Sequence, residues 1–221
     1  MHDPGNVAET QTDKGGDGSG ARRREAALAG HSGDEGAARR ALDDDDAGVR
    51  ATALVALNRA GRIRLADLRA ALIDTSARTR RSACEIAARS GEAGPGVAEA
   101  VLERLGDEDA GVVEVAAWAL GELSEHMTLP TSALTRLASI ATGHQDPLVR
   151  ESAVAALGAI GDPEGLPAIL AGTADKPAVR RRAVLALAPF GGPEVDAALA
   201  RASTDRDWQV RDAAELLLRE D

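Results

Sequence analysis

The sequence predicts an all-α protein, a right-handed α-solenoid of about six helical hairpins. Three observations carry this prediction. The chain of 221 residues is 44% hydrophobic but contains no Tyr, one Phe and two Trp, so small apolar side chains must fill its core. Such side chains suit closely packed helices. Six segments of the chain superimpose on one another, and prolines and glycines punctuate them at regular places.

The chain divides into a tail and a repeat array. Residues 1–20 are polar, rich in Gly, Asp and Thr, and lack apolar periodicity. We expect them to be disordered, because they cannot bury enough surface to offset chain entropy. The solenoid then covers residues 21–221, and Arg22–Ala29 is expected to form a lone helix from an incomplete leading pair.

The repeats align column by column at intervals of roughly thirty residues, a period typical of stacked helix pairs. Residues four and eight positions apart share one face of a helix. An alanine in every copy predicts a helix crossing too close for a larger side chain. The first, fifth and ninth positions of each copy are Val49, Thr79, Val112, Val149, Val179 and Val210; then Ala53, Ala83, Ala116, Ala153, Ala183 and Ala214; then Leu57, Ala87, Leu120, Leu157, Leu187 and Leu218.

These columns define the second helix of each pair, and a shorter first helix precedes it. Prolines are expected where helices begin and glycines where second helices end. Pro167 and Pro189 fall inside expected helices and predict a kink in each. The expected first helices are Glu35–Leu42, Leu65–Ile73, Pro95–Leu105, Pro130–Ala141, Pro163–Leu170 and Pro193–Ala202; the expected stop glycines are Gly61, Gly91, Gly161 and Gly191.

The stretch from Asp146 to Glu164 resembles a HEAT repeat, and more narrowly the short HEAT-like repeats of phycobilisome (bilin) lyases. The resemblance covers nearly all of residues 21–221 and implies the armadillo/HEAT α-solenoid fold. It does not imply one function, because scaffolds, lyase subunits and hydroxylases share this repeat. The third copy departs most, with Val113 in place of an arginine and Ser124 in place of the terminal glycine.

An arginine follows the first column in five copies, and an aspartate lies four residues before several of them. An anion-binding stripe is one interpretation. We favour a structural ladder in which each aspartate caps a helix and pairs with an arginine of a neighbouring repeat. The arginines are Arg50, Arg80, Arg150, Arg180 and Arg211, and the aspartates are Asp46, Asp146 and Asp207.

Few features of the sequence support a catalytic or metal-binding function. The HEAT-like deoxyhypusine hydroxylase is similar in fold and holds two irons with His-Glu dipeptides, but no histidine here precedes a glutamate. We therefore expect no metal and no cofactor, with His126 and His144 as solvated loop residues. Asp43–Asp46 lacks the glycine and glutamate of a calcium loop and is expected to be a solvated turn with a helix cap. Cys84 is expected to be a partly buried structural residue.

The concave face of the second helices is the candidate site, because partners of solenoids usually dock there. We expect the columns beginning at residues 51, 55 and 58 to point away from the core. The central column is largely apolar, small residues at the column of residue 58 leave room beside Trp118, and a charged column runs alongside. Trp208 is expected to pack at the C-terminal end. The candidate protein-binding residues are Val55, Trp118, Leu185 and Leu216 for apolar contact, with Arg81, Glu85, Glu114, Glu151 and Arg181 for orientation.

The sequence therefore predicts a non-catalytic scaffold or adaptor that binds a partner protein. The alternative is an enzyme or enzyme subunit of the bilin-lyase or HEAT-like hydroxylase type. A third hypothesis, a nucleic-acid enzyme resembling the HEAT-like alkylpurine glycosylases, conflicts with the net charge of −10 and the scarcity of aromatic rings. We expect no nucleic-acid or membrane partner and a cytoplasmic location, since the N-terminus lacks an apolar signal.

Overall fold

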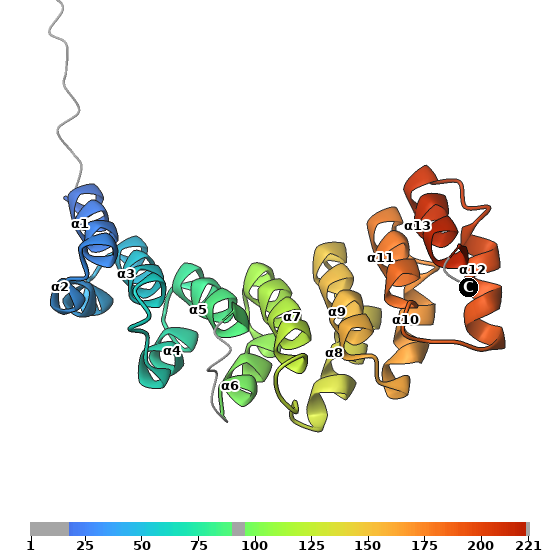
Figure 1. Ribbon diagram of the computed structural model, residues 1–221, viewed down its shortest axis with the longest axis horizontal. Helices are drawn as coiled ribbons and strands as arrows, with labels where there is room; N and C mark the ends of the chain where they lie inside the picture. Colours follow the sequence, from blue (N-terminus) through green and yellow to red (C-terminus); the bar gives the residue numbers. More distant parts are fainter. Residues whose placement is uncertain (1–17, 90–95, 220–221) are drawn as a thin grey trace, which may run out of the picture.

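The computed structural model describes residues 18–89 and 96–219, and every regular element in these ranges is a helix (Figure 1). The helices form two rows. The row of second helices consists of α1 (Ser19–Ser32), α3 (Ala47–Arg59), α5 (Ala77–Arg89), α7 (Ala110–Ser124), α9 (Pro147–Ile160), α11 (Pro177–Ala186) and α13 (Trp208–Leu218). The row of first helices consists of α2 (Glu35–Arg40), α4 (Leu65–Leu72), α6 (Val97–Glu103), α8 (Ser132–Gly143), α10 (Leu166–Gly172) and α12 (Pro193–Ala202).

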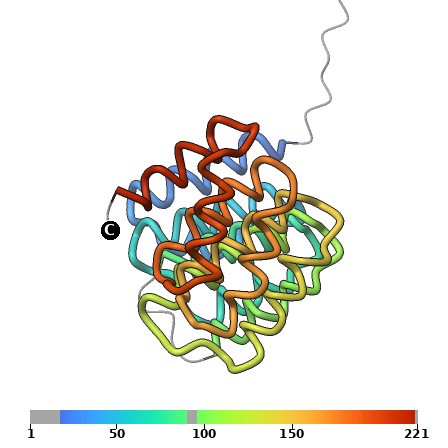
Figure 2. The backbone as a smooth tube through the Cα atoms, turned by 90° about the vertical axis from the view of Figure 1, so that its right-hand side faces the viewer, coloured from blue at the N-terminus to red at the C-terminus, as the bar shows by residue number. Residues whose placement is uncertain are grey.

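The two rows form an arc. In Figure 1 the second helices line the inner, upper side of the arc, and the ends formed by α1 and α13 rise above its middle. Each second helix packs against the next one, from α1 through to α13. Viewed from the C-terminal end, the hairpins lie one behind another (Figure 2). The structure thus confirms the predicted α-solenoid. The lone helix expected at Arg22–Ala29 is α1, which lies in the row of second helices. Residues 1–17 of the predicted tail lie outside the described residues, whereas its last two residues, Ser19 and Gly20, belong to α1, so the helical array begins earlier than expected.

The predicted core columns are confirmed. Every first-column side chain is at most 1% exposed, and all six alanines of the next column are completely buried. The third column is buried as well, except for Leu218, which is 47% exposed. Leu218 belongs to the last second helix, so no following described helix covers it.

Gly121 and Gly158, two members of the column beginning at residue 58, do not line an open groove, which corrects our expectation. A Cβ atom added to Gly158 would lie 2.6 Å from Ala186 Cβ, and one added to Gly121 would lie 3.1 Å from Ala156 Cα. These small residues are thus the places where one second helix touches the next. The room expected beside Trp118 is occupied by the neighbouring helix.

Helix ends follow the predicted capping chemistry, except that Gly191 does not end α11, which stops at Ala186. The side chains of Asp46, Asp146 and Asp207 accept hydrogen bonds from backbone N–H groups at the starts of α3, α9 and α13. Gly61 and Gly161 take positive φ angles of 64° and 67°, two residues after the end of α3 and directly after α9. Gly91 and Pro95 lie outside the described residues.

The two predicted kinks are wrong. Pro167 lies in the first turn of α10, after the 3-10 segment Pro163–Gly165, where its missing N–H costs nothing. Pro189 lies beyond the end of α11 at Ala186, because a proline cannot extend the helix that precedes it. Both prolines therefore mark helix boundaries instead of bends.

The predicted arginine ladder exists, but with different partners. Asp46, Asp146 and Asp207 serve as helix caps. The arginine forms its ion pair with a different aspartate of the following repeat, which lies one or two residues before the N-cap position. In each case the guanidinium also donates to carbonyl oxygens of its own preceding loop. The cross-repeat pairs are Arg50 with Asp74, Arg80 with Asp107, Arg150 with Asp175 and Arg180 with Asp205, at shortest distances of 2.6 to 2.7 Å.

The ladder is interrupted once, between the third and fourth copies. Val113 replaces the arginine and is 2% exposed, and His144 stands where the other repeats have the receiving aspartate. His144 Nδ1 accepts the backbone N–H of Asp146 at 3.1 Å, as Asp205 Oδ1 does for Asp207. Cation and anion are thus missing together, so no charge is left without its partner.

The close contact of second helices predicts an asymmetry between two glycines. Gly158→Ala forces a methyl group against the α11 backbone and should lower the free energy of unfolding by about 1–3 kcal/mol. Gly143→Ala, at the end of α8 with nothing within 4 Å, should be neutral or stabilising by up to about 1 kcal/mol. Urea unfolding measures both. Equal effects would contradict the contact.

The interrupted ladder predicts coupling between its two odd positions. Val113→Arg alone buries an unpaired cation and should destabilise the protein by several kcal/mol, as an unpaired buried charge does. Val113→Arg combined with His144→Asp should recover about 1–3 kcal/mol of that loss, typical of contacting pairs. A double-mutant cycle of urea unfolding measures the coupling, and strict additivity would contradict the ladder.

The ladder also predicts loss of stability in acid. The Arg150 guanidinium lowers the pKa of Asp175 below its ordinary value of 3.8, and Arg180 does the same to Asp205. A carboxyl with a lowered pKa contributes stability that is complete above its unfolded value and is lost as pH falls through the folded value. The free energy of unfolding should therefore decline below about pH 4, and Asp175→Asn should flatten that decline. Parallel curves for both proteins would refute this.

Candidate functional site

The chemistry-bearing side chains of the described residues do not gather into a reactive centre. Cys84 is completely buried, and burial raises the pKa of its thiol to about 12. Among residues 18–89 and 96–219, no three His, Cys, Asp or Glu side chains are arranged to hold a metal ion. His126 is exposed in a turn, whereas His144 is half-buried and bonded, which corrects its expected solvation.

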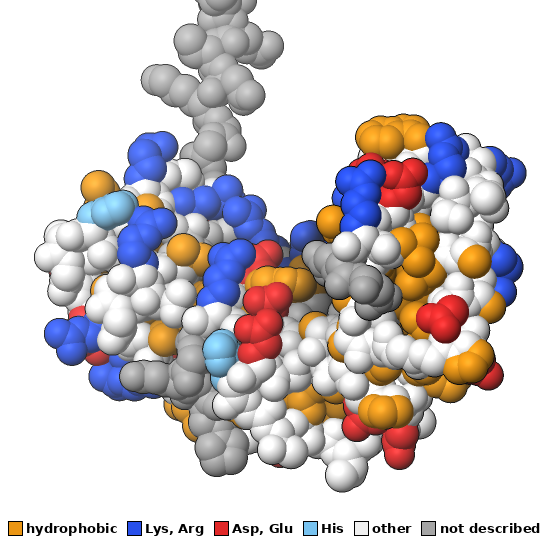
Figure 3. All heavy atoms as spheres, turned by 45° about the vertical axis from the view of Figure 1, so that its right-hand side comes forward, with side chains coloured by type: hydrophobic (Ala, Val, Ile, Leu, Met, Phe, Trp, Pro, Cys, Tyr) orange, Lys and Arg blue, Asp and Glu red, His pale blue; other side chains and the backbone are white. Residues whose placement is uncertain are grey.

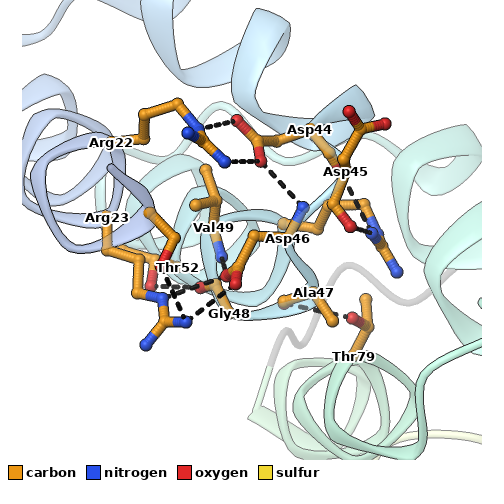
Figure 4. A network of polar contacts seen from close by, with 12 residues as sticks. Arg22, Arg23, Asp44, Asp45, Asp46, Ala47, Gly48, Val49, Thr52 and Thr79 are labelled. Atoms are coloured by element: carbon orange, nitrogen blue, oxygen red, sulfur yellow. Dashed lines mark hydrogen bonds and ion pairs between the residues drawn. The ribbon is translucent and has the colours of Figure 1, made fainter. Parts of the chain in front are cut away.

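Two carboxylates of the aspartate run at residues 43–46, those of Asp44 and Asp46, form ion pairs. Asp44 Oδ2 forms an ion pair with Arg22 Nε at 2.8 Å, and Asp46 Oδ2 forms one with Arg23 Nη2 at 2.8 Å (Figure 4). The hydrogen bond from Arg23 lowers the pKa of Asp46 to about 2. The carboxylates that join α1 to the loop before α3 are thus already occupied, and the cap predicted here is confirmed at Asp46.

Two depressions open on the concave side. Each is lined only by second helices and so lies away from the first helices. The C-terminal depression has a volume of about 320 Å³ and lies between α11 and α13. The N-terminal depression has a volume of about 210 Å³ and lies between α1, α3 and α5. Figure 3 shows the hollow of the arc with both kinds of charged side chain and apolar side chains on its walls.

The C-terminal depression joins three of the predicted site residues. Arg181, Leu185 and Leu216 line it together with Trp208, which is 65% exposed. Trp208 therefore does not pack as expected, because it begins α13 and no described helix covers it. Trp208, Asp212 and Leu216 recur at intervals of four along α13, so the helical period in the sequence could have revealed this face.

The N-terminal depression contains Val55, which is 40% exposed. Arg59 and Arg78 line the same depression, and neither was among the predicted site residues. Arg59 follows Val55 by four residues, so its place on this face was readable from the helical period. Ala51 also lines it but is only 4% exposed, so the column beginning at residue 51 is not uniformly outward.

Trp118 lies between the two depressions on α7. Its side chain is half-buried against the core, and Arg89 of α5 stands 5.6 Å from the ring centroid. At this distance a guanidinium is attracted to the ring face. The indole ring of Trp118 therefore packs partly against the core and is partly exposed to solvent.

The remaining predicted residues carry the charge of this face. Arg81 and Arg181 are exposed, whereas Glu85, Glu114 and Glu151 are half-buried. Glu151 pairs with Arg182 at 3.5 Å. The structure thus brings together Arg181, Leu185 and Leu216 of α11 and α13. It leaves Val55, Trp118 and the other charged residues at separate points along the arc.

None of the described helices combines the length and apolarity needed to cross a lipid bilayer.

A family model for HEAT repeats matches residues 134–219, which is the C-terminal part of the array. No curated protein matches the sequence. Because the match is to HEAT repeats in general, the narrower resemblance to bilin-lyase repeats stays a prediction.

Solved structures support the same fold over most of the chain. The Escherichia coli protein YibA aligns with a TM-score of 0.63 and 18% identity, covering 94% of this chain and 76% of its own. A designed armadillo repeat protein aligns with a TM-score of 0.59 and 18% identity, covering 82% and 97%. Another, in complex with the peptide (KR)4, gives 0.57 and 18%, covering 90% and 97%. The chain is thus an α-solenoid of the armadillo/HEAT type, with a recognisable HEAT-repeat region at residues 134–219.

Proposed function

We propose that this protein is a non-catalytic scaffold or adaptor that binds a partner protein along the concave face. The observation that carries the proposal is the C-terminal depression, where apolar side chains stand exposed beside charges of both signs. Trp208 and Leu216 are 65% and 52% exposed, and Arg181, Asp212 and Arg219 surround them. Exposed aromatic and aliphatic side chains with a charged margin are typical of protein interfaces.

Trp118, Leu185 and Val55 extend this apolar contact along the arc. Arg81, Arg181, Glu85, Glu114 and Glu151 set the orientation of the partner through complementary charge, which favours association of the correct partner more than raw affinity. A designed protein of this fold in complex with the peptide (KR)4 is one example of such a solenoid holding a peptide. No observation on the described residues favours the enzymatic alternatives.

The test is partner capture with matched variants of the full chain. Trp208→Ala combined with Leu216→Ala should lower retention of a captured partner at least about tenfold, since each truncation of a central apolar anchor costs over about 1 kcal/mol. Trp118→Ala should weaken capture as well. Lysate of the source cells supplies partners, and mass spectrometry compares them.

Ile73→Ala is the control, because Ile73 is 72% exposed at the end of α4, in the row of first helices. It removes an exposed apolar side chain from the opposite side of the arc. Equal retention by all folded variants, judged by circular dichroism, would refute a concave interface.

A further inference from the structure

The concave face changes sign along its length. Its N-terminal stretch, on α1, α3 and α5, carries a set of arginines that we name the basic surface. Figure 3 shows basic side chains gathered on the left-hand part of the molecule, beside the hollow. The basic surface consists of Arg24, Arg59, Arg78, Arg81 and Arg89.

Contacts and helical spacing place these arginines on the concave side. Arg59 and Arg78 line the N-terminal depression. Arg24 lies one turn before Ala27, which lines the same depression. Arg81 lies one turn before Glu85, and Arg89 stands over Trp118.

Within the described ranges, no carboxylate neutralises the positive charge of the basic surface. None of its five arginines forms an ion pair with a described residue, whereas each ladder arginine from Arg50 to Arg180 is held by an aspartate. Arg59 instead contacts His31 Nε2 at 2.9 Å. Glu85 is the one acidic side chain in the central column of this stretch. In a chain of net charge −10, such a local excess of cations attracts an anionic ligand.

We propose that the basic surface binds an acidic, extended segment of the partner protein, with one aliphatic side chain seated beside Val55. This inference rests on the proposed function and names the chemistry of the partner at one end of the arc. The depression beside Val55, at about 210 Å³, is below the range of small-molecule sites and suits a single side chain.

The surroundings of the basic surface favour a short protein segment over other anions. Beyond α5 the next helix of the concave face, α7, carries the carboxylates Glu114 and Glu122, which repel a long polyanion that follows the groove. A flat bilayer cannot follow the inside of an arc. Three neighbouring helices about 10 Å apart span about 20 Å, the length of about six extended residues.

The experiment measures fluorescence anisotropy of a labelled peptide on the full chain. The probe is a ten-residue peptide rich in glutamate with one central leucine, and its partner probe has glutamine in place of every glutamate. We expect the acidic probe to bind at least about tenfold more tightly than the glutamine probe, and to weaken as salt rises through the physiological range.

Arg59→Glu combined with Arg78→Glu should weaken the acidic probe at least about tenfold. Arg40→Glu with Arg201→Glu, exposed arginines of α2 and α12, is the control and should change binding less than about twofold. If the reversal variant fails to fold, Arg59→Gln with Arg78→Gln should still weaken binding several-fold.

Absence of binding to the unaltered chain, or equal loss in the control, overturns the proposal. Tighter binding of a single-stranded oligonucleotide of the same length overturns the assignment to a protein segment. If Trp208→Ala with Leu216→Ala releases a captured partner while the arginine variants retain it, the scaffold function stands and only this inference fails.

Discussion

The close contact between successive second helices is the constraint on which the rest of the structure depends. Six alanines at equivalent places are completely buried, and Gly121 and Gly158 touch the backbone of the next helix. No larger side chain fits these places without moving a neighbour. Gly30, Gly121 and Gly158 lie at such contacts on α1, α7 and α9, so the second helices approach closely at several points along one continuous arc.

The ladder adds polar specificity to this apolar contact. Each arginine joins its own loop to an aspartate of the next repeat, so it fixes the offset of one hairpin on another. Burying such a pair costs desolvation of both ions, which the attraction between them must offset. We interpret the ladder chiefly as a device for register. At Val113 and His144 the ion pair is absent, but α7 still packs against α9 through apolar side chains.

Much of the fold was readable from the sequence, because the period of the buried columns repeats six times. The ends of helices were harder to predict. Pro167 and Pro189 lie within apolar patterns that suggested kinked helices, but each marks a helix boundary. The apolar pattern alone does not distinguish a kink from a boundary. The caps were predicted at Asp46, Asp146 and Asp207, yet the partners of the arginines were not. Two aspartates often stand close together before a second helix, and only their geometry separates the cap from the ion pair.

The candidate site was less predictable for a related reason. Helical spacing identified Val55, Leu185 and Leu216 as outward, but whether a small residue at the next position leaves space depends on the distance to the following helix. Because the following helix is close, Gly121 and Gly158 contact that helix and do not line a groove. Spacing could also have pointed to Trp208 and Arg59, but Trp208 was expected to pack and Arg59 was not among the predicted site residues.

The central claim, that small residues between second helices set the arc, is tested most directly by small-angle X-ray scattering of the unaltered chain and of Gly158→Leu. The added side chain should wedge α9 from α11 and change the distance distribution of the arc, with helicity retained by circular dichroism. Superimposable scattering curves from a folded variant would contradict the claim, because curvature would then not depend on this contact.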